Sequence, residues 1–144
     1  MKSITTFALA LLMSLCSFAK ADDSARGEIK TSFKKNFQNA QIINTEVRKG
    51  FTKLTFRMNE VVMFAYYSEN GELLAVTRNI LSSQLPVSLL MSLKEDYNGY
   101  WITELFELSG DGGDSYYVSL ESADSKIVLR SNGEYWEEYS NTKK

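Results

Sequence analysis

The residue types that most often carry out catalysis are scarce in this sequence. Histidine is absent, and Cys16 is the single cysteine. Without histidine, neither a Ser-His-Asp triad nor a Cys-His pair can be built, and zinc and haem lose their usual ligands. No nucleophile elbow, phosphate loop or dinucleotide fingerprint occurs. We therefore expect a protein that is not an enzyme and that holds no metal or cofactor.

Two carboxylate clusters remain as candidate sites. The stretch Gly110–Asp114 (GDGGD) lacks the alternating ligands and the distal glutamate of a calcium loop, so a hairpin loop is the favoured interpretation. Glu137 and Glu138 are adjacent in a predicted strand and point to opposite faces, so they cannot act as a catalytic pair.

Neighbouring aromatic residues suggest binding rather than catalysis. The pairs are Tyr66-Tyr67, Tyr100-Trp101, Tyr116-Tyr117 and Tyr135-Trp136. In a strand, one member of each pair faces the core and the other faces outward. Tyrosine and tryptophan dominate binding hot spots, which favours an aromatic binding surface. The alternative is that both faces are simply well packed, or that the rings form cross-strand pairs.

Alternation selects the outward member in two of these pairs. Tyr116 alternates with apolar residues and is predicted to face inward, so Tyr117 is predicted to face outward. Trp101 shares its face with Thr103 and Glu107, which predicts an outward tryptophan and leaves Ile102 and Phe106 for the core.

For the other two pairs alternation does not decide, and we choose Tyr67 and Trp136. With two arginines that would orient a partner, the predicted partner-binding residues are Trp101, Tyr117, Tyr67, Trp136, Arg57 and Arg130.

The elements that would position these residues fall into two similar sets. Apolar residues at helical spacing predict helices over Ala25–Gln38 and Gln84–Tyr97. Each helix is followed by four strand-like runs with period-two alternation. The predicted strands are Ile42–Arg48, Phe51–Met58, Val61–Tyr67, Glu72–Arg78, Trp101–Leu108, Ser115–Glu121, Lys126–Arg130 and Glu134–Tyr139.

The tripeptide Asn-Gly-Glu occurs between the third and fourth predicted strands of both sets, at Asn70 and at Asn132. Asn-Gly is the strongest short hairpin signal, because both residues tolerate the positive φ of a type I′ turn. The sequence therefore predicts an α+β fold made by tandem duplication of an α-β-β-β-β unit, with an antiparallel sheet and the helices on one face.

These stretches resemble the PepSY-like family of β-lactamase-inhibitor-like proteins. The likeness is carried by YSENGELLAVTRNI (67–80), LPVSLLMSLKEDY (85–97), WITE (101–104) and YYVSLESADSKIVL (116–129), and it extends over nearly all of residues 22–144. The resemblance implies a secreted bacterial protein with two helix-plus-sheet repeats, similar to β-lactamase inhibitor protein (BLIP), whose concave sheet grips an enzyme. It also implies a link to PepSY domains, which are thought to restrain peptidases.

The first 21 residues have the pattern of a secretory signal peptide, with a positive start, a short apolar run and small residues before a cleavage point after Ala21. The alternatives are a retained membrane anchor and a lipoprotein acylated at Cys16. Cleavage leaves residues 22–144 as one domain, with repeat one over about 24–80 and repeat two over about 81–140. It removes the cysteine, and the predicted location is periplasmic or secreted, without stable membrane insertion.

Charge is unevenly distributed along the predicted mature chain. Removal of Lys2 and Lys20 leaves 14 basic and 18 acidic residues, a net charge of −4. Residues 22–80 carry 9 basic and 7 acidic side chains, whereas residues 81–144 carry 5 basic and 11 acidic ones. An acidic second half argues against nucleic acid or an anionic membrane as partner.

The function expected from the sequence is a non-enzymatic binding module that engages a protein or peptide through an aromatic sheet face. Inhibition of an extracytoplasmic enzyme is the sharpest form of this hypothesis. The alternatives are a small-ligand carrier or sensor of the cell envelope and a self-associating structural envelope protein. The sequence identifies neither the partner nor the oligomeric state.

Overall fold

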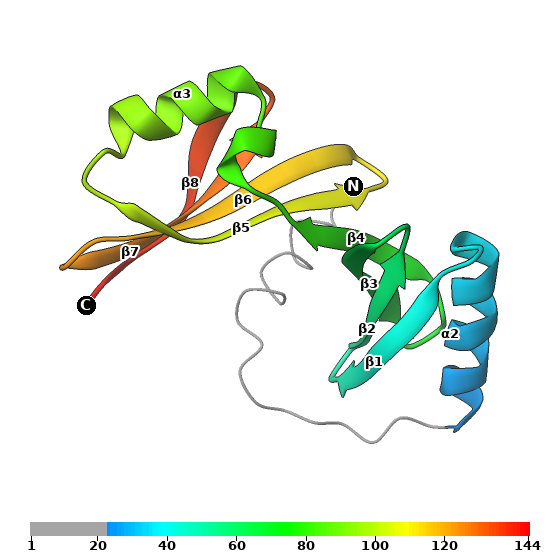
Figure 1. Ribbon diagram of the computed structural model, residues 1–144. Helices are drawn as coiled ribbons and strands as arrows, with labels where there is room; N and C mark the ends of the chain where they lie inside the picture. The colour runs from blue at the N-terminus through cyan, green and yellow to red at the C-terminus, as the bar shows by residue number, and fades with distance from the viewer. Residues whose placement is uncertain (1–22) are drawn as a thin grey trace. The chain divides into compact units, whose positions relative to one another are not determined.

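The structure is a computed structural model that describes residues 23–144, so the predicted signal peptide over residues 1–21 lies outside the described residues (Figure 1). The helices are α2 (Asp23–Asn36), a 3-10 turn η1 (Ser82–Gln84) and α3 (Val87–Asp96). The strands are β1 (Gln41–Arg48), β2 (Phe51–Met58), β3 (Val61–Ser68), β4 (Leu73–Asn79), β5 (Trp101–Gly110), β6 (Gly113–Glu121), β7 (Ser125–Asn132) and β8 (Tyr135–Lys143). The strands form an antiparallel sheet whose strand order follows chain order, which confirms the predicted α+β class. No helix of the described part is long and apolar enough to cross a membrane.

Contacts divide the chain into two compact units. The first contains the described residues up to Thr77 together with residues 110–112, and the second contains Arg78–Ser109 and Gly113–Lys144. In each unit one α-helix precedes four strands, although the last two residues of β4 belong to the second unit. The order of elements is therefore the one that the sequence predicted.

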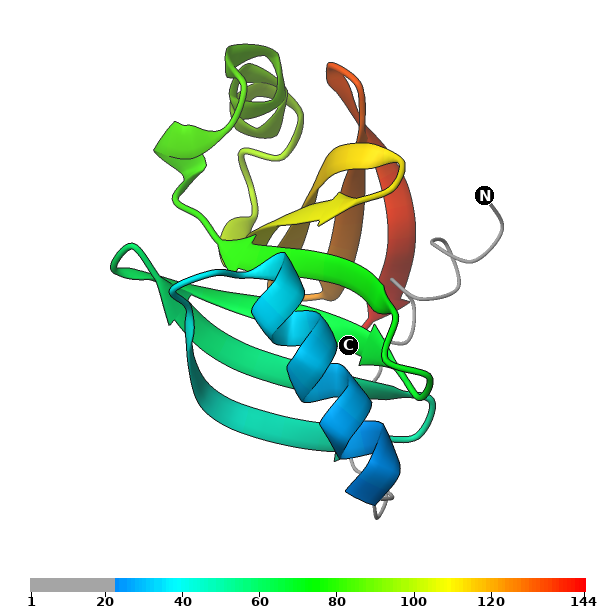
Figure 2. The same ribbon diagram turned by 90° about the vertical axis from the view of Figure 1, so that its right-hand side faces the viewer.

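The core of the first unit lies between α2 and the strands that it covers. Ile29 and Phe33 are buried on one side of the helix, one turn apart, as expected for an amphipathic helix. The ring of Phe33 meets the edge of Phe56 from β2 at a centroid distance of 5.1 Å, a favourable aromatic geometry. Figure 2 shows this helix in blue, lying across the strands of its unit.

The core of the second unit is built in the same manner beneath α3. Leu89 and Leu93 are the buried residues of the helix, and Leu93 packs with Val118 and Leu120 of β6 and with residues of β7. Because α3 has only 10 residues, this apolar face contributes more to its stability than intrinsic helix propensity does. A side chain of the last strand also contacts the helix directly: Trp136 of β8 donates its indole N–H to the Leu89 carbonyl at 2.9 Å.

The predicted elements are all present, with shifted ends. The helix predicted to begin at Gln84 begins at Val87, after the 3-10 turn and Pro86. β8 runs to Lys143 rather than ending at Tyr139, because its pairing with β7 continues to Ser125↔Lys143 after a register shift at Val128 and Leu129.

The Asn-Gly pairs do form hairpin connections, but neither forms the predicted type I′ turn. At both pairs only the glycine has a positive φ, 78° at Gly71 and 63° at Gly133. The two left-handed residues that a type I′ turn requires occur instead at Asn59 (φ 50°) and Glu60 (φ 67°), between the paired ends of β2 and β3. The prediction failed because turn propensity favours Asn-Gly over Asn-Glu for a type I′ turn, whereas the pairing register of the strands determines which two residues form that turn.

Candidate functional site

Tyr67, predicted to face outward, lies in the core of the first unit. Its side chain has 0% exposure and packs with residues beneath α2. Its hydroxyl lies 3.3 Å from Oδ1 of Asn36 in that helix and donates to it. Burial raises its pKa to about 12, while the nearby Ser32 hydroxyl acts in the opposite direction. The choice of Tyr67 as a surface residue is therefore wrong.

Tyr117, the second predicted surface tyrosine, is also buried. It points away from the α3 core, as its alternation with Val118 predicted, yet its exposure is 1%. Phe106 stacks on it with ring centroids 5.2 Å apart, and Tyr139 meets it edge-on at 5.8 Å. The guanidinium carbon of Arg130 lies 5.9 Å from its ring centroid. The prediction of an exposed Tyr117 is wrong because side chains of β5, β7 and β8 cover it.

Trp136 is likewise the wrong member of its pair. Its ring packs against the α3 core, and its indole N–H is bonded to Leu89, whereas Tyr135 is 59% exposed. The hydrogen bond explains the preference, since a buried indole N–H needs a partner and the helix carbonyl supplies one.

Trp101 is exposed as predicted, although the faces of β5 were assigned incorrectly. The tryptophan is 53% exposed at the start of the strand. Leu105, which has the same alternation, lies in the α3 core, whereas Phe106 packs on Tyr117 and Ile102 is 43% exposed. Exposed tryptophan is uncommon in a folded protein, so Trp101 is the starting point for a candidate site.

The two predicted arginines belong to different units. Arg57 is exposed on β2 of the first unit, whereas Arg130 and Trp101 belong to the second. Arg130 is partly buried over Tyr117, and within residues 23–144 its Nε has no hydrogen-bond partner. The six predicted residues thus do not form one surface, and Trp101 is the large aromatic among them that remains open to solvent.

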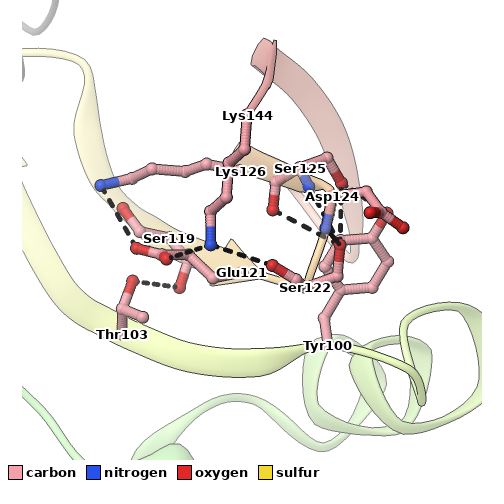
Figure 3. A network of polar contacts seen from close by, with 9 residues as sticks. All are labelled: Tyr100, Thr103, Ser119, Glu121, Ser122, Asp124, Ser125, Lys126 and Lys144. Carbon is pink, nitrogen blue, oxygen red and sulfur yellow. Dashed lines mark hydrogen bonds and ion pairs between the residues drawn. The ribbon is translucent and has the colours of Figure 1, made fainter.

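A network of polar contacts centres on Glu121 (Figure 3), and one of its members, Lys144, lies close to Trp101. The Lys144 ammonium is 2.9 Å from Oε2 of Glu121 and donates to the Ser122 carbonyl at 2.9 Å. Lys126 reaches Oε1 of the same carboxylate at 3.8 Å. The Lys144 nitrogen also lies 5.5 Å from the centre of the Trp101 ring, within range of a cation–π contact.

The β6–β7 turn and the start of β5 hold this network in place. Backbone N–H groups of Asp124 and Ser125 donate to the Ser122 hydroxyl at 3.3 and 3.2 Å, which fixes the turn and hence the direction of the Ser122 carbonyl. The hydroxyls of Tyr100 and Ser125 are 3.2 Å apart, which ties the residue before Trp101 to the same turn. The acceptors are therefore positioned by the end of β6, the start of β5 and a hydrogen-bonded turn.

A cavity of about 530 Å³ adjoins the network and shares Glu121 and Lys126 with it. It is lined by Asn79, Ile80, Thr103, Glu104, Leu105, Glu121 and Lys126. Two carboxylates and one ammonium make this lining acidic. Its volume is within the range of ligand-binding pockets, about 300–1,000 Å³.

The Lys144 contact also dominates the titration of Glu121. Its hydrogen bond, together with the positive charges of Lys144 and Lys126, holds the pKa of the Glu121 carboxyl below its usual value. Glu121 is therefore ionised at neutral pH and acts as an acceptor. Within residues 23–144 no group of three or more histidine, cysteine, aspartate or glutamate side chains could hold a metal ion. The chemistry that this arrangement offers is recognition of positive charge.

Sequence reasoning did not identify Glu121, Ser122 or Lys144 as site residues. A sequence pattern could have indicated Glu121, because it shares the predicted outward face of its strand with Tyr117 and Ser119. Lys144 had none, since its position depends on the extra length of β8 and on a backbone bond from its N–H to the Asp124 carbonyl at 2.9 Å.

The first unit contains a separate groove of about 450 Å³ between α2 and the strands β1 and β2. Its floor is apolar, with Ile29, Ile42, Val47 and Leu54, and two cationic side chains, Arg26 and Lys30, line it as well.

Known proteins resemble this chain in fold. A BLIP-like protein from Bacteroides fragilis superposes with a TM-score of 0.69 at 17% identity, covering 88% of this chain and 89% of that one. A DUF2874 family protein from Bacteroides ovatus gives 0.71 at 12% identity, with 85% and 89% covered. A protein described as periplasmic from Bacteroides eggerthii gives 0.70 at 11% identity, with 87% and 90% covered. No protein-family model and no curated protein sequence matches. The chain therefore has a BLIP-like fold, as the sequence resemblance implied.

Proposed function

We propose that this chain is a non-enzymatic periplasmic binding module that engages a protein or peptide through the surface around Trp101. The observation that carries the proposal is the exposed tryptophan, 53% accessible, beside an ordered network of polar and charged side chains. A large aromatic ring next to oriented polar groups is the usual composition of a binding hot spot. Inhibition of an extracytoplasmic enzyme is the finer form of the proposal, and the BLIP-like fold supports it by analogy alone.

The location and the repeat pattern are part of the same proposal. The signal-peptide pattern of residues 1–21 and the fold shared with a protein described as periplasmic both support export. The order of one helix and four strands in each unit supports an origin by tandem duplication of an α-β-β-β-β unit.

Capture of a partner from an envelope extract tests the proposal. The immobilised protein should retain a defined partner, and Trp101→Ala should remove it while leaving the melting temperature within a few degrees. Tyr135→Ala is the matched control, because Tyr135 is a similarly exposed aromatic, 59% accessible, in the same unit but at the β7–β8 hairpin. Equal loss of capture in both variants would contradict a site at Trp101, and so would full capture by both.

The groove beneath α2 favours a second candidate function, the carriage of a small amphipathic molecule. An apolar floor with Arg26 and Lys30 in its lining suits an acyl chain that ends in a carboxylate or phosphate. A carrier should release such a molecule on denaturation, as mass spectrometry would show. Ile42→Trp, which fills the groove from β1, should reduce the amount that co-purifies. Unchanged recovery in that variant would exclude the groove as the binding site.

A further inference from the structure

The contacts of Lys144 describe a recognition site rather than a simple surface ion pair. Three different acceptors converge on its ammonium: the Glu121 carboxylate at 2.9 Å, the Ser122 carbonyl at 2.9 Å and the Trp101 ring at 5.5 Å. A lysine ammonium has three donor hydrogens and also interacts favourably with an aromatic face. These acceptors together satisfy such a group.

We propose that Trp101, Glu121 and the Ser122 carbonyl form a binding site for a lysine side chain, that Lys144 occupies it within the chain, and that a lysine of the partner peptide displaces Lys144. The inference deepens the proposed function, on which it rests, by naming the chemistry of the partner: a segment with an accessible lysine. Lys144 acts as an internal stand-in for that ligand.

The geometry selects a lysine over an arginine. A guanidinium binds best when both oxygens of a carboxylate accept its planar pair of N–H groups. Here the Lys144 ammonium meets only Oε2 of Glu121, and the positive charge of Lys126, 3.8 Å from Oε1, disfavours a second cationic group that spans both oxygens. A compact ammonium needs only that one oxygen, and its remaining donors are directed to the Ser122 carbonyl and the ring.

Lys144 is held loosely enough to exchange. Its side chain is 42% exposed to solvent. Its backbone is held separately, by a hydrogen bond from its N–H to the Asp124 carbonyl. Exposed ion pairs of this kind are weak, so the occupied form should exceed the open form only by about two- to five-fold. A partner lysine can therefore compete without unfolding any element.

Two further features suit a lysine-bearing peptide. The cavity that shares Glu121 presents Asn79, Thr103 and Glu104, polar groups that can meet the peptide backbone on either side of the lysine. Residues 81–144 carry 11 acidic and 5 basic side chains, which would attract a basic segment at a distance.

The test uses the two tryptophans of the protein as reporters. In ¹⁵N-labelled protein each indole N–H gives its own NMR signal, and Trp136, bonded to Leu89, serves as the internal reference. The probe is acetyl-Gly-Lys-Gly-amide, with the norleucine and arginine analogues as controls. In Lys144→Ala the lysine peptide should shift the Trp101 signal in a saturable manner, and the norleucine peptide should not.

The wild-type protein should need about three- to six-fold more lysine peptide than Lys144→Ala, because Lys144 competes for the site. Adding Glu121→Gln to Lys144→Ala should weaken binding about two- to five-fold, as expected for loss of an exposed ion pair. If that double variant does not fold, lowering the pH to protonate Glu121 in Lys144→Ala makes the same test, and the peptide should be released.

Three outcomes would overturn the inference: no saturable Trp101 shift in Lys144→Ala, an affinity for the lysine peptide that is unchanged by the loss of the Glu121 charge, or equal affinity for the arginine peptide. Failure of the proposed function would be recognised separately. A protein that binds the probe but captures no partner has the site without the function. One that captures a partner through Trp101 but ignores the probe has the function with a different chemistry.

Discussion

Replacement of Tyr117 by alanine should cost about 3–5 kcal/mol of unfolding free energy, the range for truncation of a buried aromatic ring. Its ring is 1% exposed and lies between Phe106 at 5.2 Å and Tyr139 at 5.8 Å, so alanine would leave a cavity that neither rigid neighbour can fill. A domain of this size has about 5–15 kcal/mol in total, so the loss is a large fraction of its stability.

Urea denaturation followed by tryptophan fluorescence measures this loss. With a urea dependence of about 2 kcal/mol per molar, the midpoint for Tyr117→Ala should fall by roughly 1.5–2.5 M. Tyr117→Leu should cost less than alanine, and Tyr117→Phe less still, because more of the side-chain volume is retained in each case. Trp101→Ala is the matched contrast and should cost no more than about 1 kcal/mol, since the ring is 53% exposed. Similar shifts for Tyr117→Ala and Trp101→Ala would refute the assignment of one ring to the interior and the other to the surface.

Two further predictions follow from backbone geometry and from titration. Glu60 has a φ of 67°, a conformation that disfavours any residue with a Cβ, so Glu60→Gly should raise the unfolding free energy by about 0.5–1 kcal/mol; Asn59→Gly should change it less, and an unchanged midpoint for Glu60→Gly would contradict this account. Burial raises the pKa of Tyr67 to about 12 from 10, so the stability due to its neutral form is fully present below pH 10 and is lost as the pH rises toward 12. The urea midpoint should therefore fall between pH 9 and pH 11, and it should fall less in Tyr67→Phe than in the wild-type protein. An equal fall in both proteins would assign the alkaline transition to other groups.

The order of elements could be predicted from the sequence because each element carries its own period. The helical spacing of Ile29 and Phe33 and the alternation of Val118 and Leu120 are local patterns, and packing in both units agrees with them. The exact ends of the helices and strands were harder to predict from the sequence. The length of β8 depends on its pairing with β7 and on a register shift, which no local pattern records.

The candidate site was harder to predict, because alternation gives the face of a residue but not what covers that face. Tyr117 points away from α3 and is still buried, since Phe106 and Tyr139 from other strands close over it. Trp101 remains exposed although its alternation matches that of the core residue Leu105. Lys144 reaches the site only through the tertiary path of β8, so composition could not place it beside Glu121.

The bond from Trp136 to the Leu89 carbonyl has a consequence for the order in which the protein folds. It joins residues 47 positions apart, and a helix of 10 residues is marginal without tertiary support. In a chain that becomes available from its N-terminus, α2 can find β2 and β3 early, and α3 can pack on β6 and β7 before β8 is available. The bond from Trp136 to Leu89 forms last, so the second unit gains its full set of contacts only when the final strand is available.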